Sequence, residues 1–232
     1  MTRTPASNTS TIIAGVALIA AGILFIIGEA VAAAGWPDDS YSYITNVISD
    51  LGVSSPAETN EGIWIHSPAA WAINSGWVIN GALTLVAAIV FRRILRASRT
   101  GSWVFGLAIA YSAGLCVVAT FHNAPAWMLP YHAIGAMVGM GGGNIAMFLT
   151  GLLLRKAKGY SLTSLYFTVA GIFGFSCLIL TFVGPQDYVG LIERGAAYPF
   201  LIAQVVGGAV ICRNATQLSV LRSPRSTVSA LD

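Results

Sequence analysis

The chain has 232 residues, of which 56% are hydrophobic and only 9% are charged, and its mean hydropathy is +0.73. Soluble domains carry about 25% charged residues, so this composition excludes a soluble globular protein and indicates an integral membrane protein. The length fits one multi-pass domain without a second, soluble one. The net charge of +3 does not indicate a nucleic-acid partner, because the basic residues follow a membrane topology, as described below.

Six apolar segments are long enough to cross a membrane, since about 20 apolar residues span the hydrocarbon core. We expect spans at residues 11–34, 69–94, 102–121, 131–154 and 161–183, and a sixth that begins between 189 and 196 and ends near 212. At Ala30-Val31-Ala32 the first segment resembles the cleavage site of a signal peptide. However, the apolar region of a signal peptide has about 7–15 residues, and this segment is longer and contains Glu29. We therefore expect it to remain as an uncleaved helix.

The expected fold class is all-α, a polytopic six-helix transmembrane bundle at residues 11–212. Residues 1–10 are expected to form a cytoplasmic tail. Residues 213–232, rich in Ser, Thr and Arg, are expected to form a second cytoplasmic tail that is disordered.

The first connection, residues 35–67, is the longest. Four of its apolar residues recur with the period of an amphipathic helix: Ile44, Val47, Ile48 and Leu51. A cap at Asp38, Asp39 or Ser40 and an end at Gly52 would complete a short helix. We expect this helix to lie on the outer membrane surface, with Asn46, Ser49 and Asp50 on its polar side.

The distribution of charge predicts the topology. Eleven of the twelve basic residues fall on the side of the termini, and only Arg194 falls on the other side. Eight of the nine acidic residues lie in or near the opposite half. By the positive-inside rule, both termini are cytoplasmic, and we expect the protein in the cell (plasma) membrane.

The stretch from Phe121 to Asn144 combines two features. His122 and His132 lie on either side of a short proline-containing loop. Gly135, Gly139 and Gly143 then recur every fourth residue, which places them on one helix face and lets a neighbouring backbone approach closely. We expect a tight helix-packing seam with two imidazoles at its mouth.

Seven polar residues are expected near the outer ends of the spans, where they are candidates for a functional site: Asp50, His66, His122, His132, Asp187, Glu193 and Arg194. Three imidazoles with carboxylates are residue types that zinc uses, although no HExxH, HxxxH or CxxC spacing is present. Alternatively, the histidines cap helix ends or bond loop carbonyls at the interface. The outer aromatic residues, which include Trp64 and Trp127, are expected to form an interfacial belt.

Glu193 and Arg194 lie near the entrance of the sixth span, where an unpaired charge is costly. A carboxylate from Glu29, Asp50 or Asp187 could pair with Arg194 and fix the first connection to the bundle. Alternatively, Arg194 binds an anionic head group such as a lipid phosphate. Deeper in the membrane, the amides of Asn80, Asn144 and Gln204 are expected to join helices, or else to line a polar path.

Three outer motifs together resemble a known family: Ile48-Ser49-Asp50-Leu51-Gly52, His132-Ala-Ile-Gly135, and Gly190 to Gly195 with Tyr198-Pro199. They are similar to the prokaryotic six-span membrane family catalogued as a domain of unknown function, number nine-nine-eight. The similarity covers most of the chain. It implies the six-span fold and the importance of Asp50, His132, Glu193 and Arg194, and it implies no activity.

Our leading functional hypothesis is non-enzymatic, without a cofactor. An outward-facing polar vestibule would bind a lipid head group or small amphiphile through Asp50, His132, Glu193 and Arg194, or the protein would act as a membrane scaffold, in a homo-oligomer or a membrane complex. The alternative is a zinc-dependent hydrolase of lipid amides or esters with His66, His122 and His132 as metal ligands, Asp50 beside them and Glu193 as general base. A small transporter is the second alternative.

Overall fold

The computed structural model describes residues 8–37, 40–59, 62–157 and 159–216. Within these residues, six helical segments are long and apolar enough to cross a membrane. They are α1 (Asn8–Ala34), α2 (Ala70–Leu95), α3 (Arg99–Thr120), a fourth span of three parts, α6 (Ser161–Val183) and α7 (Val189–Arg213). The chain is therefore a multi-pass membrane protein, and the predicted six-helix bundle is confirmed.

The fourth span consists of α4 (Leu129–Ala136), a single π-helical segment η3 (Met137–Gly141) and α5 (Gly142–Leu154). It forms one continuous span from Leu129 to Leu154. The glycines at 141–143 therefore do not interrupt this span. A transporter of the kind built from discontinuous helices would require such an interruption. A π-helical segment inserts one extra residue into the turn, and such segments occur frequently at functional sites.

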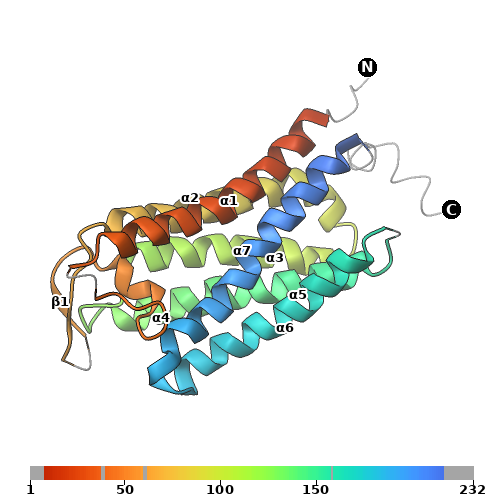
Figure 1. The fold of residues 1–232 in the computed structure, drawn as a ribbon. Helices are drawn as coiled ribbons and strands as arrows, with labels where there is room; N and C mark the ends of the chain where they lie inside the picture. Colours follow the sequence, from red (N-terminus) through yellow and green to blue (C-terminus); the bar gives the residue numbers. More distant parts are fainter. Residues whose placement is uncertain (1–7, 38–39, 60–61, 158, 217–232) are drawn as a thin grey trace.

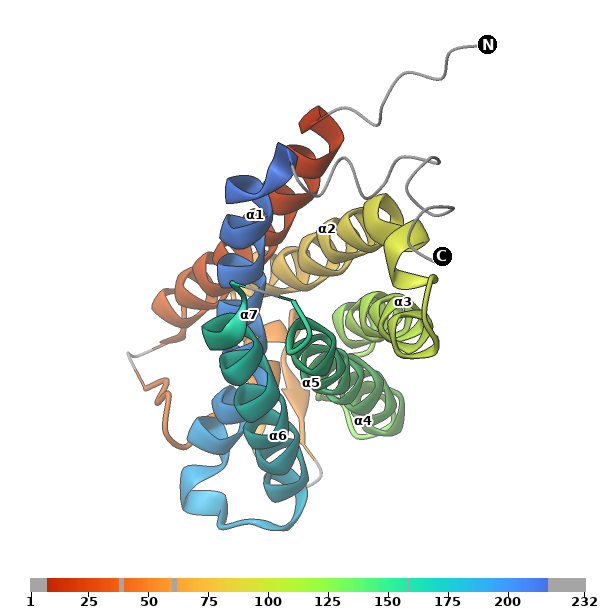
Figure 2. The same ribbon diagram turned by 90° about the vertical axis from the view of Figure 1, so that its right-hand side faces the viewer.

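The spans form a closed ring in sequence order. Each helix packs against the next one along the chain, and α7 returns to pack against α1. Figure 2 shows this ring, with α1, α2 and α3 followed by α4–α5, α6 and α7 around a common centre. The largest apolar cluster fills the centre, with contributions from Phe25, Ile73, Trp77, Leu115 and Leu201.

The predicted glycine seam packs α3 against the fourth span. A Cβ added to Gly114 would lie 2.7 Å from the Gly135 carbonyl oxygen and 2.5 Å from the Gly139 nitrogen. A Cβ on Gly143 would lie 3.0 Å from the Tyr111 ring, which also belongs to α3. Three glycines of the fourth span thus face one helix, and the two backbones touch where no side chain separates them.

All three mid-membrane amides join helices directly. Asn80 donates to Gln204 Oε1 at 2.9 Å, and Gln204 donates back to Asn80 Oδ1 at 3.1 Å, so α2 and α7 are held by reciprocal bonds. Tyr111 on α3 donates to the same Asn80 oxygen at 2.6 Å. Asn144 lies apart from them and donates to the carbonyls of Met140 and Ala196.

One end of the bundle carries most of the irregular structure. α1 begins and α7 ends at the opposite end, as Figure 1 shows. The first end carries residues 35–69, 121–128 and 184–188, and it is called the hairpin end below, after the β-hairpin of β1 (Ala57–Glu58) and β2 (Trp64–Ile65).

The amphipathic helix expected in the first connection is not confirmed. The segment folds instead into a turn at residues 43–45 and one short 3-10 helix, η2 (Ile48–Gly52), in which Ile48, Ser49, Leu51 and Gly52 are buried. Ser49 therefore does not lie on an exposed polar side. The residues proposed as its cap, Asp38 and Asp39, lie outside the described residues.

Two long-range interactions explain the difference. The backbone N–H of Ile48 donates to the carboxylate of Glu193, and the carbonyl of Ile44 accepts the N–H of Leu191 at 3.0 Å. Both bonds tie the segment to α7 and draw it towards the ring, so Ile48 and Leu51 are buried against the bundle, while Ile44 stays exposed.

Candidate functional site

The charged centre of the hairpin end is an ion pair between the first and last spans. Arg194 Nε donates to Glu29 Oε1 at 2.9 Å, and the two side chains are 4% and 1% exposed. Tyr198, one helical turn further along α7, donates to Glu29 Oε2 at 3.0 Å. Of the three carboxylates considered as partners of Arg194, the structure pairs it with Glu29.

The two terminal nitrogens of Arg194 also donate to the protein. Nη1 lies 2.9 Å from each of three carbonyl oxygens, those of Tyr43, Asn46 and Gly190. Nη2 donates to the Tyr41 hydroxyl at 2.6 Å, and the guanidinium carbon lies 4.5 Å from the centre of the Tyr43 ring. Arg194 thus fixes residues 41–46 to α1 and α7. A lipid phosphate could bind this guanidinium only by displacing these protein acceptors.

Burial raises the pKa of the Tyr41 phenol, although the guanidinium acts in the opposite direction. The phenol therefore stays protonated and donates to the carbonyl of Val47 at 3.0 Å while it accepts from Arg194. This relay extends the clamp from Arg194 to the start of η2.

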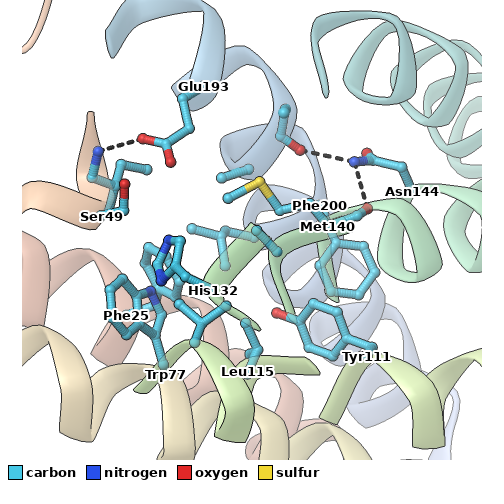
Figure 3. Close-up of a pocket in the computed structure, with 16 residues that line it drawn as sticks. Phe25, Ser49, Trp77, Tyr111, Leu115, His132, Met140, Asn144, Glu193 and Phe200 are labelled. Carbon is cyan, nitrogen blue, oxygen red and sulfur yellow. Dashed lines mark hydrogen bonds between the residues drawn. The ribbon is translucent and has the colours of Figure 1, made fainter. Parts of the chain in front are cut away.

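Glu193 points to a different side of α7 from Arg194, because neighbouring helical residues diverge by about 100°. One of its carboxylate oxygens accepts the Ile48 N–H, and Figure 3 shows the other directed into a cavity. Glu193 and Arg194 therefore hold the same connection at two points, residues 41–46 and Ile48.

The cavity beside Glu193 lies inside the ring and measures about 30 Å³, enough for about two water molecules. His132 and Ser49 also line it, and Figure 3 shows them with Glu193 on one side of the cavity. His132 Nδ1 lies 2.8 Å from the Phe121 carbonyl oxygen. A carbonyl can only accept a hydrogen bond, so Nδ1 carries the hydrogen and Nε2 carries the lone pair. The remaining lining is mostly apolar, including Phe25, Trp77 and Leu115.

The other predicted site residues lie elsewhere. Asp50 accepts from the Asn123 amide at 2.8 Å and so joins η2 to the 121–128 connection. His66 is half-buried, and Asp187 is exposed. In the part of the chain that the structure describes, no three or more His, Cys, Asp or Glu side chains form a group that could hold a metal ion.

An open groove of about 810 Å³ lies on the hairpin end, between residues 54–64 and the 121–128 connection. Its polar lining comprises Ser54, Ser55, Glu58, Thr59 and His122, and its large apolar side chains are Trp64, Trp127 and Met128. Trp64 and Trp127 are 69% and 61% exposed. The volume lies within the about 300–1,000 Å³ of small-molecule sites.

The walls of the groove are held in place by buried contacts. Val53, Ala57, Ile65 and Ala124 form a small apolar cluster that packs the hairpin against the 121–128 connection. In the register of the hairpin, Ala57 faces Ile65 and Glu58 faces Trp64. Alternate residues of a strand point to opposite faces, so the first pair anchors the hairpin while Glu58 and Trp64 face the groove together.

His122 connects the groove to the bundle. Its ring nitrogen Nε2 lies 3.5 Å from the amide nitrogen of Asn74. The imidazole also forms a hydrogen bond with the backbone of Ala119. Burial lowers the pKa of His122, and the bond to Ala119 offsets this only in part. The imidazole is therefore neutral at pH 7 and brings no positive charge to the groove.

Sequence reasoning did not identify the groove. The sequence predicts an interfacial belt for Trp64 and Trp127, and Ser54, Ser55 and Glu58 belong to no motif. The available signal was charge: residues 35–69 hold five acidic residues and no Lys or Arg, and residues 121–128 hold no charged residue.

The fold and this end of the bundle define a class: a six-span membrane protein with a buried ion pair and an open aromatic groove at one end. The chain belongs to the family described as "Protein of unknown function (DUF998)", whose model matches residues 7–210. The resemblance inferred from the sequence is thereby confirmed. Comparisons with curated proteins and with solved structures gave no match.

Proposed function

We propose that the protein binds the polar head group of a membrane lipid in the groove between residues 54–64 and 121–128. The observation that carries this proposal is the groove itself, about 810 Å³ in volume, with exposed tryptophans and hydroxyl groups on its walls. The vestibule hypothesis is thus kept, but its residues change from Asp50, His132, Glu193 and Arg194 to those of the groove.

The position of the groove supports a lipid over a water-soluble ligand. Met128 lines it, and the fourth span begins at the next residue, Leu129. Trp64 and Trp127 have the amphipathic rings that settle at the boundary between lipid and water. A lipid whose acyl chains lie along the outside of α4 would therefore place its head group beside these rings.

The other two polar features fit this role less well. The donors of Arg194 are occupied by protein acceptors, so an anionic head group would have to displace them. The cavity at Glu193 and His132 measures about 30 Å³, which is too small for a head group. Their side chains nevertheless hold the surroundings of the groove in place. Arg194 and Glu193 fix residues 41–48, and His132, near the start of the fourth span, bonds the Phe121 carbonyl.

The side of the membrane follows from the charges. The end opposite the hairpin end carries Arg92, Arg93, Arg96, Arg99, Arg155 and Lys156, and the positive-inside rule places it in the cytoplasm. The groove would then face outward from the cell membrane, towards the outer leaflet.

The test is lipid retention. The protein is purified in a mild detergent, delipidated by extended washing, and incubated with a natural lipid extract before bound lipid is counted by native mass spectrometry. Trp127→Ala should retain several-fold less lipid than the wild-type protein. The matched control is Trp71→Ala, which removes a tryptophan that is 67% exposed at the start of α2 but does not line the groove. Equal retention by both variants and the wild type would contradict the proposal.

A further inference from the structure

We infer that the groove selects lipids whose head group carries an ammonium ion over lipids whose head group is only anionic. This inference rests on the proposed function and adds the chemical class of the ligand. It follows from the charge of the groove, from the pairing of Glu58 with Trp64, and from the positions of the hydroxyl groups.

Of the two connections that build the groove, the first is acidic and residues 121–128 carry no charged side chain. In the described part of the first connection, residues 35–37, 40–59 and 62–69, the charged residues are Asp50 and Glu58, and neither this part nor residues 121–128 contains a Lys or an Arg. Glu58 is exposed and lines the groove. Arg194 is paired with Glu29 inside the bundle. A positively charged head group is therefore attracted to this end of the molecule, and a purely anionic one is repelled.

Glu58 and Trp64 form a site of the kind that an ammonium ion requires. They are direct cross-strand partners in the antiparallel hairpin, and such partners have Cβ atoms about 5 Å apart. A carboxylate beside an indole face offers an ionic partner and a cation–π partner at once. Trp127 lines the same groove from the 121–128 connection and supplies a second indole.

The uncharged polar groups suit the rest of such a head group. Ser54 and Ser55 line the groove and are exposed, so their hydroxyls can donate to the phosphate oxygens that link the ammonium arm to glycerol. His122 is neutral, as described above, and does not compete with the ammonium ion for Glu58. The ligand class is thus a phospholipid with a primary or quaternary ammonium group.

The experiment compares three synthetic lipids with identical acyl chains: phosphatidylethanolamine, phosphatidylcholine and phosphatidylglycerol. Each is titrated into delipidated protein in detergent, and binding is measured by native mass spectrometry at low and high salt. The two ammonium lipids should bind roughly two- to fivefold more tightly than phosphatidylglycerol. The difference should shrink at high salt, because exposed charges are screened.

Glu58→Gln should reduce the preference, and Asp187→Asn, which removes an exposed acid outside the groove, should leave it unchanged. Both positions are exposed, so both variants are expected to fold, and their melting temperatures verify this. Equal binding of all three lipids that still depends on Trp127 would overturn this inference and leave the proposed function standing. Tighter binding of phosphatidylglycerol would also overturn the inference, and binding that does not depend on Trp127 would overturn both.

Discussion

Arg194 on the last span and Glu29 on the first form an ion pair with an Nε–Oε1 distance of 2.9 Å, and both side chains are almost completely buried. Their bond closes the ring of helices at the hairpin end. The same guanidinium bonds the carbonyls of Tyr43 and Asn46. One side chain therefore fixes both the helix ring and the connection that leads to the groove.

Replacing one member of this pair should destabilise the protein strongly. Arg194→Met leaves the Glu29 carboxylate buried without its cation, and breaking a buried pair costs about 3–5 kcal/mol. Unfolding by a denaturing detergent, followed by circular dichroism, measures the change. The control is Arg93→Met, which removes an exposed arginine in the last turn of α2 and should change stability little. An Arg194→Met protein as stable as the control would contradict the assigned role of the pair.

Gly114→Ala should destabilise the contact between α3 and the fourth span. The new Cβ would lie 2.7 Å from the Gly135 carbonyl oxygen, and such overpacking costs about 1–3 kcal/mol. Gly106→Ala is the matched control on the same helix, because a Cβ there meets nothing within 4 Å. It should be neutral, or stabilising by up to about 1 kcal/mol through helix propensity. Equal melting temperatures for the two variants would show that this seam does not need its glycines.

Stability should depend on pH through His122. Burial lowers its pKa below the ordinary 6.5, so in acid the unfolded chain takes up the proton before the folded chain does. Stability is then full above about pH 6.5 and falls as the pH drops from there towards the lowered pKa of the folded state. Melting temperatures measured across this range for the wild type and for His122→Gln test the prediction. A pH dependence that is the same in both proteins would contradict it.

We expect the protein to need no metal ion. No three metal-binding side chains converge among the described residues, and the imidazoles of His122 and His132 are directed to Ala119 and Phe121. Protein purified without chelator should contain no stoichiometric zinc, and EDTA should leave its melting temperature unchanged. About one zinc per chain, lost in His132→Ala, would contradict this and favour the metal-dependent hydrolase.

The spans could be predicted from the sequence because the hydrophobic length of a segment is a local property. Residues 161–183 were predicted with the bounds that the structure gives to α6. The partner of Arg194 could only be narrowed to Glu29, Asp50 or Asp187, because the loops decide which carboxylate comes close. The amphipathic helix is not confirmed for the same reason, since the partner of the Ile48 N–H is Glu193, 145 residues away.

The groove could not be predicted, because its two walls come from different connections. Glu58 and Trp64 meet through the register of a hairpin whose strands have two residues each. Trp127 lines the same groove from the 121–128 connection, which packs on the hairpin through Ala124. Exposed tryptophans near span ends indicate a membrane boundary equally well with or without a ligand site. The absence of Lys and Arg from both connections was visible in the sequence, but it acquires a meaning only once the walls are brought together.

The most direct test of the central proposal is to locate a bound lipid. A phospholipid that carries a photoreactive diazirine on its head group is incubated with the delipidated protein, irradiated, and mapped by peptide mass spectrometry. We predict crosslinks within residues 54–64 and 122–128, reduced in Trp127→Ala and retained in Trp71→Ala. Crosslinks confined to other parts of the bundle, or spread evenly over it in all three proteins, would contradict the assignment of the groove as a head-group site.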